Sequence, residues 1–185
     1  MDSISKQDII TGLRKLGIEA GMELEVHSSL KSFGYVEGGA VTVIEAIKET
    51  VGCNGSIFMP SLRLGPRLPL SEEDKRLGIT LKIKILSPDA EHSGMGLIAD
   101  TFRQMPDVLT GDGIFRVSAW GRNADKVSSG FQYLIDNGGK ALLLGVDIYR
   151  LTSMHYVEDL LPQKSGIFLS LPKKLIRSIP RNNGS

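Results

Sequence analysis

The sequence predicts a single-domain α/β fold of three layers, in which helices flank a mostly parallel central sheet. Three observations support this fold class. The 185 residues are enough for one well-buried domain, which we expect to span 1–185. A strand, a glycine-bearing loop, a helix and a second strand follow one another between Gly21 and Pro60, the order of a βαβ unit with parallel strands. The most apolar run, 140–146, is flanked by glycines, which is typical of a central strand buried on both faces.

Hydrophobic periodicity predicts the first two elements. Apolar residues from Ile9 to Leu16 share one helical face, and Gly17 supplies the end of this helix. Alternation of apolar and polar residues around Val26 then predicts a strand that ends at His27. His27 therefore lies at the edge of the sheet where ligands bind in open α/β folds.

The next elements complete the βαβ unit and lead into an irregular stretch. Helical spacing of apolar residues predicts a helix over 41–51, and the apolar run 56–59 predicts a strand. Prolines and clustered charges make 61–77 an excursion whose shape the pattern does not assign. Alternation over 81–85 predicts a half-exposed strand.

The second half returns to regular elements. The glycines of 94–96 open a helix that Pro106 stops, and 117–120 has the composition of a strand. A helix of modest periodicity is predicted over 124–135. After the apolar strand, one more helix is predicted over 152–161, with apolar residues on a single face.

Composition excludes several classes of protein. The net charge is +1, from 22 Lys and Arg against 21 Asp and Glu, and no basic run is present, so we expect no nucleic-acid partner. No apolar run approaches the roughly 18 residues that cross a membrane, so no membrane partner is expected. Cys53 is the only cysteine and is most simply an incidental thiol. No cluster has metal-ligand spacing, and the polar start at Met1 lacks a signal-peptide pattern, so we expect a metal-free cytoplasmic protein.

The three histidines differ in their promise as functional residues. His92 lies in a polar turn and is expected to be solvated. His27 is as readily a hydrogen-bonded turn residue as a ligand contact. His155 is the best candidate, because it lies in the first turn of a helix with Glu158 three residues later on the same face. A carboxylate so placed can fix the imidazole tautomer and leave the other nitrogen free to take a proton. The spacing alone also fits a helix-capping Glu without catalysis.

The loop between His27 and Val41 is a candidate anion-binding site. Serine hydroxyls, glycines and a helix N-terminus provide donors and a positive dipole end suited to a phosphate, and Lys31 adds a charge. The loop lacks the Gly-Lys-Ser/Thr ending of a Walker motif, and its Gly34 and Gly38 have the wrong spacing for a dinucleotide fingerprint. A glycine-rich turn without a ligand is the alternative.

Four segments, taken in order, resemble the aminoglycoside 3-N-acetyltransferase family of antibiotic acetyltransferases, which is distinct from the GNAT type. The first is 27–44, which begins His-Ser-Ser-Leu-Lys-Ser-Phe-Gly. The others are Gly-Ser-Ile-Phe-Met-Pro-Ser at 55–61, Gly-Met-Gly-Leu-Ile-Ala-Asp-Thr-Phe-Arg at 94–103, and the apolar strand with its Thr-Ser-x-His-x-x-Glu turn at 139–158. The resemblance covers about residues 9–161.

The resemblance implies transfer of an acetyl group from acetyl-CoA to an amino group of an aminoglycoside or similar amino sugar, without a metal. It makes His155 the general base and Glu158 the residue that orients it. It also implies a small-molecule amine as partner and a monomer or homodimer as the assembly. The residues that it implies for CoA binding are His27, Ser28, Ser29, Leu30, Lys31, Ser32, Phe33, Gly34, Val36, Gly38, Gly39 and Ala40.

The chain departs from the family pattern around the acceptor site. Asp112-Gly113 stands where the family usually has His-Pro. We therefore expect a domain that lacks the family's acceptor-site insert, between Trp120 and Gly139, and much of the family's C-terminal part. These departures leave two alternatives open: a catalytically degenerate CoA-binding protein of the same fold, and a fragment that needs a partner chain to complete its core.

Overall fold

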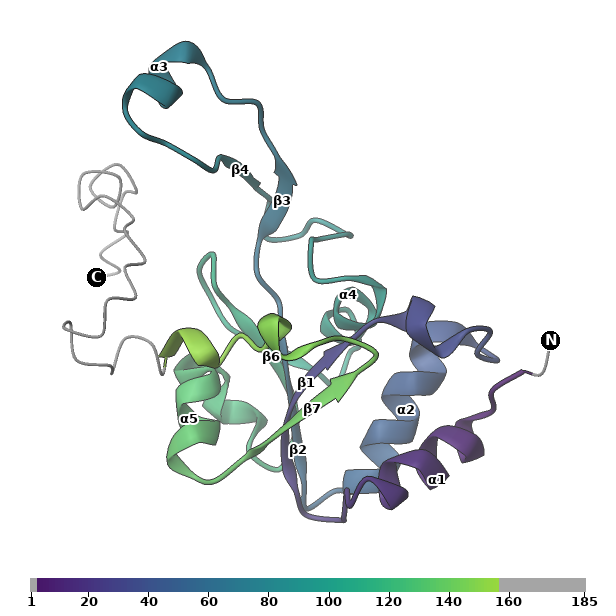
Figure 1. The fold of residues 1–185 in the computed structure, drawn as a ribbon. Helices are drawn as coiled ribbons and strands as arrows, with labels where there is room; N and C mark the ends of the chain where they lie inside the picture. The colour runs from purple at the N-terminus through teal and green to yellow at the C-terminus, as the bar shows by residue number, and fades with distance from the viewer. Residues whose placement is uncertain (1–2, 157–185) are drawn as a thin grey trace.

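This computed structural model describes residues 3–156 of the chain. Its centre is a five-stranded sheet (Figure 1). Its strand order is β5-β6-β2-β1-β7. β1 pairs in parallel with both β2 and β7, as the βαβ unit predicts, whereas β6 pairs antiparallel with β2 and β5. The expected α/β fold with a mostly parallel sheet is confirmed. The strands are β1 (Glu23–Ser28), β2 (Ser56–Pro60), β5 (Leu109–Thr110), β6 (Val117–Gly121) and β7 (Lys140–Leu144).

Three helices cover one face of the sheet (Figure 1). The first begins at a capping box, in which the Ser5 hydroxyl accepts from the Asp8 N–H. Ile10 is buried as predicted, but Leu16 is 67% exposed because the helix has already ended at Lys15. These helices and the facing side chains of β1, β2 and β7 form the larger apolar core. They are α1 (Lys6–Lys15), α2 (Gly39–Val51) and α4 (Leu97–Arg103).

The opposite face carries a smaller layer, which completes the three layers expected. Phe58 points to this side of β2, whereas its neighbours Ile57 and Met59 point to the larger core, so β2 is buried on both faces. The helix predicted over 124–135 is here two elements, because Gly130 adopts φ +57° and interrupts it. They are η2 (Ala124–Ser129) and α5 (Phe131–Asp136).

The prediction of a central position for the strand 140–146 is wrong within the described sheet. β7 is its edge strand and pairs only with β1 there. Leu142 and Leu144 are buried against the larger core, but Ala141 is exposed and Leu143 is half-buried. An apolar run predicts that its side chains can be buried. It does not predict whether the strand pairs with another strand along one edge or along both.

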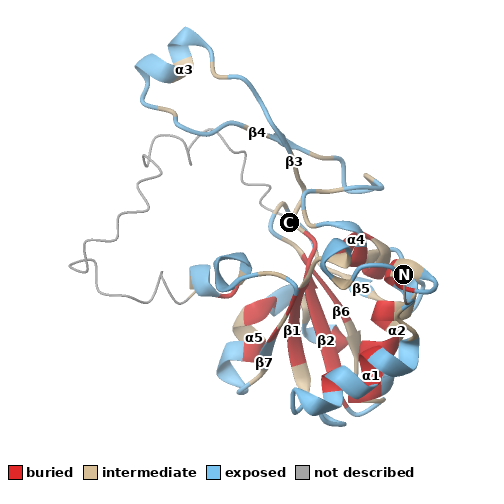
Figure 2. Ribbon diagram, turned by 45° about the vertical axis from the view of Figure 1, so that its right-hand side comes forward, coloured by how far each residue is buried: buried red, intermediate tan, exposed pale blue. Residues whose placement is uncertain are grey.

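The excursion after β2 is an arm that projects from the body (Figures 1 and 2). Its two strands pair antiparallel, and the half-exposed strand predicted over 81–85 is confirmed in its second strand. Figure 2 shows the arm as almost wholly exposed, in contrast to the buried residues of the central sheet. The arm comprises β3 (Leu64–Arg67), α3 (Glu72–Arg76) and β4 (Ile83–Ile85).

The structure also bears on the helix predicted over 152–161 and on the expected absence of a membrane span. The helix expected over 152–161 begins at Met154, and its residues beyond Tyr156 lie outside the described part. Within residues 3–156, each helix is too short or too polar to cross a bilayer.

Candidate functional site

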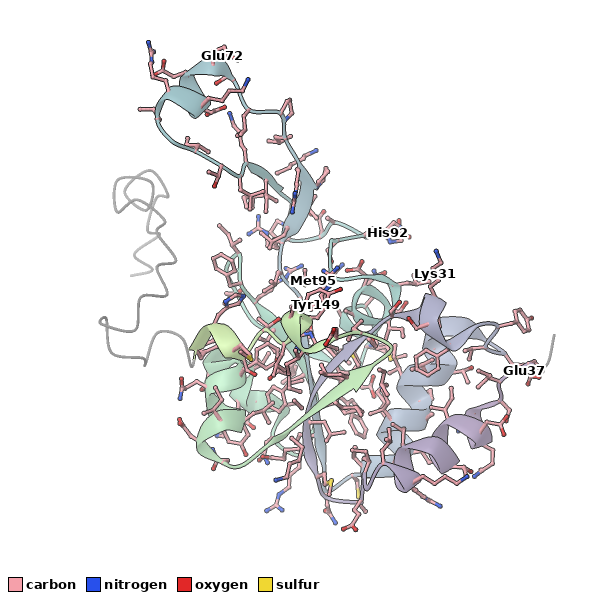
Figure 3. All side chains as sticks on the ribbon, viewed as in Figure 1. Lys31, Glu37, Glu72, His92, Met95 and Tyr149 are labelled. Carbon is pink, nitrogen blue, oxygen red and sulfur yellow. The ribbon has the colours of Figure 1, made fainter. Side chains whose placement is uncertain are left out.

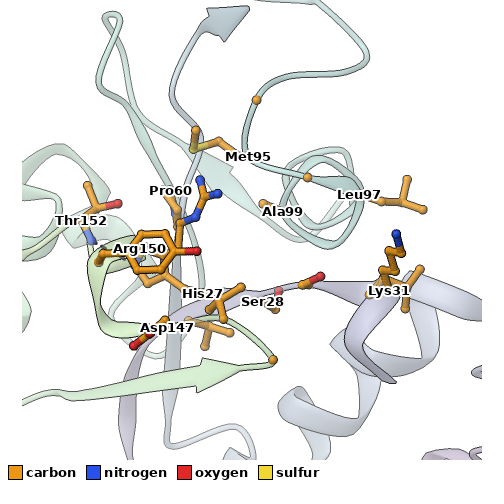
Figure 4. Close-up of a pocket in the computed structure, with 18 of the residues that line it drawn as sticks. His27, Ser28, Lys31, Pro60, Met95, Leu97, Ala99, Asp147, Arg150 and Thr152 are labelled. Atoms are coloured by element: carbon orange, nitrogen blue, oxygen red, sulfur yellow. Dashed lines mark hydrogen bonds between the residues drawn. The ribbon is translucent and has the colours of Figure 1, made fainter. Parts of the chain in front are cut away.

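A cavity of about 1270 Å³ opens at the carboxyl ends of the parallel strands β1, β2 and β7 (Figure 4). This is the position where open α/β sheets bind ligands. Its walls come from the loop after β1, from Pro60 and Leu62 after β2, from 94–97 at the start of α4, and from the segment after β7. The first and last of these segments contain the short helices η1 (Leu30–Phe33) and η3 (Ile148–Arg150).

The loop after β1 is fastened to the end of β7. The Ser29 N–H donates to the Leu144 carbonyl at 3.0 Å, and the Ser32 hydroxyl donates to the Gly145 carbonyl at 2.8 Å. The loop ends at Gly34, whose φ of +81° reverses the chain after η1. These contacts hold the backbone of the loop at the rim of the cavity.

The cavity combines polar groups with apolar surface. Ser28 and Ser29 provide hydroxyls, and Figure 4 shows the cations Lys31 and Arg150 on opposite sides of the cavity. Apolar side chains such as Met95 and Leu97 line the wall contributed by the start of α4. The arrangement suits an elongated ligand that has both anionic and apolar parts.

A buried carboxylate shapes the wall before α4. Asp100, which is only 3% exposed, accepts from the Ser93 N–H at 2.8 Å and from the Ser93 hydroxyl at 2.6 Å. The Ser93 hydroxyl in turn accepts from the Met95 N–H at 3.1 Å. The glycines Gly94 and Gly96 are thereby held in one loop conformation against the cavity.

The structure divides the expected CoA-binding residues into two groups. Those that line the cavity are His27, Ser28, Ser29, Leu30, Lys31 and Gly34. The other six lie outside its lining: Ser32 fastens the loop from behind, Phe33 packs against the larger core, and Val36 bridges to Ile4. Gly38, Gly39 and Ala40 begin α2. The N-terminus of α2 therefore does not line this cavity. Of the loop expected to bind an anion, only η1 and the residues on either side of it reach the cavity.

His27, which lines the cavity, forms a buried pair with Glu25, which lies outside the lining. His27 is 6% exposed and Glu25 is 3% exposed, and the His27 Nε2 lies 2.7 Å from the Glu25 Oε1. His27 also packs beside Phe131, with ring centroids 6.2 Å apart. Glu25 was not among the functional residues predicted from the sequence. The available signal was a carboxylate between two apolar residues, Leu24 and Val26, in a predicted strand.

The two expected catalytic residues stand differently. His155 is exposed and lies in the helical turn that begins at Met154, where its N–H donates to the Thr152 carbonyl at 3.1 Å. Thr152 lines the cavity, but the His155 side chain is not part of the lining found among the described residues. Glu158 lies outside the described residues.

The remaining polar candidates are peripheral. His92 is exposed on its loop, away from the sheet (Figure 3), as predicted. Cys53 is an exposed free thiol. Among residues 3–156, no group of three His, Cys, Asp or Glu side chains is arranged to hold a metal ion.

Comparison with known proteins connects this site to a family. The model of the family described as aminoglycoside 3-N-acetyltransferase matches residues 26–173. The chain belongs to this family. The match includes all four segments whose resemblance was noted from the sequence, among them the loop after β1, the start of α4 and the turn that carries His155.

Individual family members agree in sequence and fold. The prophage-derived aminoglycoside N(3')-acetyltransferase-like protein YokD of Bacillus subtilis is 32% identical over 91% of this chain and 70% of its own. The crystal structure of YokD superposes with a TM-score of 0.71 at 30% identity, covering 86% of this chain and 71% of that one. Aminoglycoside N(3)-acetyltransferase III of Salmonella sp is 28% identical over 91% of this chain and 65% of its own.

A further solved structure shares the fold at lower sequence identity. The solved structure of AAC-IIIb with CoASH has a TM-score of 0.70 at 20% identity, covering 87% of this chain and 66% of that chain, and supports the fold alone. The chain thus spans about two thirds of the length of these acetyltransferases. The family is one of acetyl-CoA-dependent acetyltransferases.

Proposed function

We propose that this protein transfers an acetyl group from acetyl-CoA to an amino group of an aminoglycoside or a similar amino sugar. The observation that carries the proposal is the cavity at the carboxyl ends of β1, β2 and β7, in a chain whose residues 26–173 match an acetyltransferase family. The position of the cavity follows from the sheet topology, and its lining follows from the segments that resemble the family.

The cavity fits CoA in size and in chemistry. Its volume of about 1270 Å³ exceeds the roughly 300–1,000 Å³ typical of pockets for small ligands. Lys31 and the hydroxyls of Ser28 and Ser29 can bind phosphate oxygens, and Arg150 offers a second cation. The apolar side chains of Met95 and Leu97 suit the less polar pantetheine arm. We propose that the six lining residues of the loop after β1 contact CoA and that the other six support this loop.

The proposed chemistry needs one proton acceptor. Acetyl-CoA supplies the acetyl group as a thioester; the amine nitrogen bonds to the acetyl carbon, the carbon–sulfur bond breaks, and CoA leaves as the thiol. We propose that His155 accepts the proton that the amine loses, and that Glu158 fixes the tautomer of its ring. The turn bearing His155 adjoins the cavity through Thr152, whose carbonyl binds the His155 N–H. Binding of the amine between this turn and the thioester would complete the site.

The test separates binding of the donor from transfer. Calorimetric titration with CoA measures the first, and acetyl-CoA consumption with a panel of aminoglycosides measures the second. We expect His155→Asn to lower kcat on the order of 10²- to 10⁴-fold, the usual contribution of a general base, with the Kd for CoA unchanged. His92→Asn is the matched control, because this histidine is exposed and is not among the residues that line the cavity, and it should leave both quantities unchanged.

Two results would contradict the proposal. Tight CoA binding without turnover of any amine would indicate the catalytically degenerate CoA-binding protein. Equal loss of activity in His155→Asn and His92→Asn would exclude His155 as the base.

A further inference from the structure

We propose that Glu25 is a positioning residue, whose buried carboxylate holds the turn that carries His155 against the end of β1. The inference rests on the proposed function for its catalytic consequence, but its structural content is independent of activity. It concerns residues 128 positions apart in the chain, Glu25 and Ser153.

Glu25 makes two contacts through one oxygen. Its Oε1 lies 2.7 Å from the His27 Nε2 and accepts from the Ser153 N–H at 3.0 Å. Ser153 is itself buried, and its carbonyl accepts from the Tyr156 N–H at 3.0 Å, which closes the helical turn around His155. A carboxylate thus binds a backbone N–H at the beginning of a helical turn, the place where a negative charge is stabilised.

A second contact joins the same strand to the turn. The Thr152 N–H donates to the His27 Nε2 at 3.3 Å, and this nitrogen lies 2.7 Å from the Glu25 Oε1. Two adjacent backbone N–H groups of the turn, those of Thr152 and Ser153, therefore donate to side chains of β1.

A glutamate at this position is costly unless it contributes something that an apolar residue does not. Glu25 is 3% exposed. Its neighbours in the strand, Leu24 and Val26, are fully buried on the opposite face of the sheet. Burial of a charge requires partners, and an apolar side chain of similar volume often gives equal or greater stability. The groups that Glu25 contacts lie on His27, which lines the cavity, and on Ser153, which follows the cavity residue Thr152. We therefore assign its role to the site.

The contact between Glu25 and Ser153 affects how the proposed base, His155, is placed relative to bound acetyl-CoA. β1 ends at Ser28 and leads directly into the proposed CoA-binding loop, whereas the His155 turn follows β7 after the connection 145–151. Glu25 joins these two segments side chain to backbone, next to the parallel pairing of His27 with Leu143. Loss of this join would let the His155 turn move relative to the bound thioester.

The test compares Glu25→Leu, Glu25→Gln and a matched control, Glu23→Leu. Glu23 lies on the same strand and the same face, and accepts from the Tyr133 hydroxyl at 3.0 Å and from Asn123, far from residues 152–153. Leu removes the acceptor while keeping the volume of the side chain, and Gln keeps one acceptor oxygen. The first readout is amide hydrogen exchange of Ser153 relative to Val26 in β1, measured by NMR in the full chain.

We expect Glu25→Leu to accelerate exchange of the Ser153 amide at least about 10-fold relative to Val26. We expect it to lower kcat on the order of 10- to 100-fold, the effect of a misplaced catalytic group, and to change the KM for acetyl-CoA by no more than about twofold. Glu25→Gln should restore most of both effects. Glu23→Leu should lower stability without changing either readout.

Three outcomes would overturn the proposal: Ser153 exchange unchanged in Glu25→Leu, the same exchange and kcat changes in Glu23→Leu, or no recovery in Glu25→Gln. If the unaltered protein acetylates no amine, the proposed function fails, and the exchange comparison still decides whether Glu25 fixes the turn.

Discussion

Ser32 and Gly145 lie in direct contact at the rim of the cavity, where the Ser32 hydroxyl donates to the Gly145 carbonyl at 2.8 Å. A Cβ on Gly145 would lie 2.2 Å from the Ser32 Cβ, so the contact requires glycine. Gly145 also adopts φ +67°, which disfavours other residues. The end of β7 and the loop after β1 therefore meet at a position with no space for a side chain.

Gly145→Ala is expected to displace the loop after β1. The left-handed conformation costs about 1–2 kcal/mol, and the overlap with Ser32 adds on the order of 1–3 kcal/mol. Gly138→Ala is the matched control, since it lies just before the same strand with φ +71° but has nothing within 4 Å of its added Cβ. We expect weaker CoA binding in Gly145→Ala only, measured by calorimetry alongside urea unfolding. Equal CoA affinity in the two variants would contradict a role for this contact in the site.

Lys31 is expected to contribute its charge to CoA binding. Because Lys31 lines the cavity on η1 and is exposed to solvent, Lys31→Gln should raise the Kd for CoA by about 3- to 10-fold, as for a solvent-screened charge pair. The variant should also show a weaker dependence of Kd on salt concentration. Lys6→Gln, which removes an exposed cation paired with Glu49 on the α1 side, should bind as the unaltered protein does. An unchanged salt dependence in Lys31→Gln would remove this residue from the phosphate-binding group.

Asp107 is expected to give the larger core an acid-sensitive contact. Burial acts to raise its pKa, but the hydrogen bonds and charge of the buried Lys48, at 3.0 and 2.9 Å, together with the Trp120 N–H, outweigh burial and hold the pKa below 3.8. Because the folded-state pKa is depressed, the stabilisation is present above pH 3.8 and is lost as pH falls through the lower folded value.

Two substitutions test this contact by urea unfolding as a function of pH. Asp107→Asn removes the nearer of the two carboxylates that pair with Lys48, the other being Glu45 at 3.6 Å, and should cost on the order of 1–3 kcal/mol at neutral pH. Lys48→Met replaces the buried cation with an apolar side chain of similar length and should change stability at neutral pH by about 1 kcal/mol or less. It should also remove the acid-dependent loss that Asp107 contributes. If both variants retain the pH profile of the unaltered protein, the contact does not stabilise the fold.

Asp74 provides a titration test on the projecting arm. The Ser71 N–H, then Lys82, then the Ser71 hydroxyl donate to its carboxylate and lower its pKa to about 2. Its contribution to the order of α3 is therefore present above pH 3.8 and is lost as pH falls through about 2. NMR titration of the Asp74 carboxyl carbon should give a midpoint near 2 in the unaltered protein and a higher midpoint in Lys82→Met. An ordinary midpoint of 3.8 in the unaltered protein would show that the arm does not hold this cap in solution.

Hydrophobic periodicity in the sequence predicted the helices and strands that short-range patterns of apolar residues determine. Period-2 alternation located β1, which ends at Ser28, one residue after the predicted end at His27. Helical spacing predicted a helix over 41–51, and α2 begins two residues earlier, at Gly39. The glycine-flanked apolar run located β7 but suggested the wrong place for it in the sheet. The helix predicted over 124–135 failed at Gly130, because periodicity does not show where a glycine adopts a positive φ.

Part of the site was also within reach of the sequence. The βαβ order predicts that the carboxyl ends of β1 and β2 meet, and hence that His27, Ser28 and Ser29 lie at a ligand-binding edge. The sequence could not separate the six residues that line the cavity from the six that do not, because that division depends on the η1 turn and on the contact between Ser32 and Gly145.

The sequence by itself determined the fold class, the parallel βαβ unit, the loop at its carboxyl edge and the family to which the motifs belong. The tertiary structure alone decided that β7 is an edge strand of the described sheet and that Glu25 meets Ser153. The physical reason is that hydrophobic periodicity records whether a side chain is buried. The partner of a buried polar group, by contrast, is set by strand register and by the path of a distant connection.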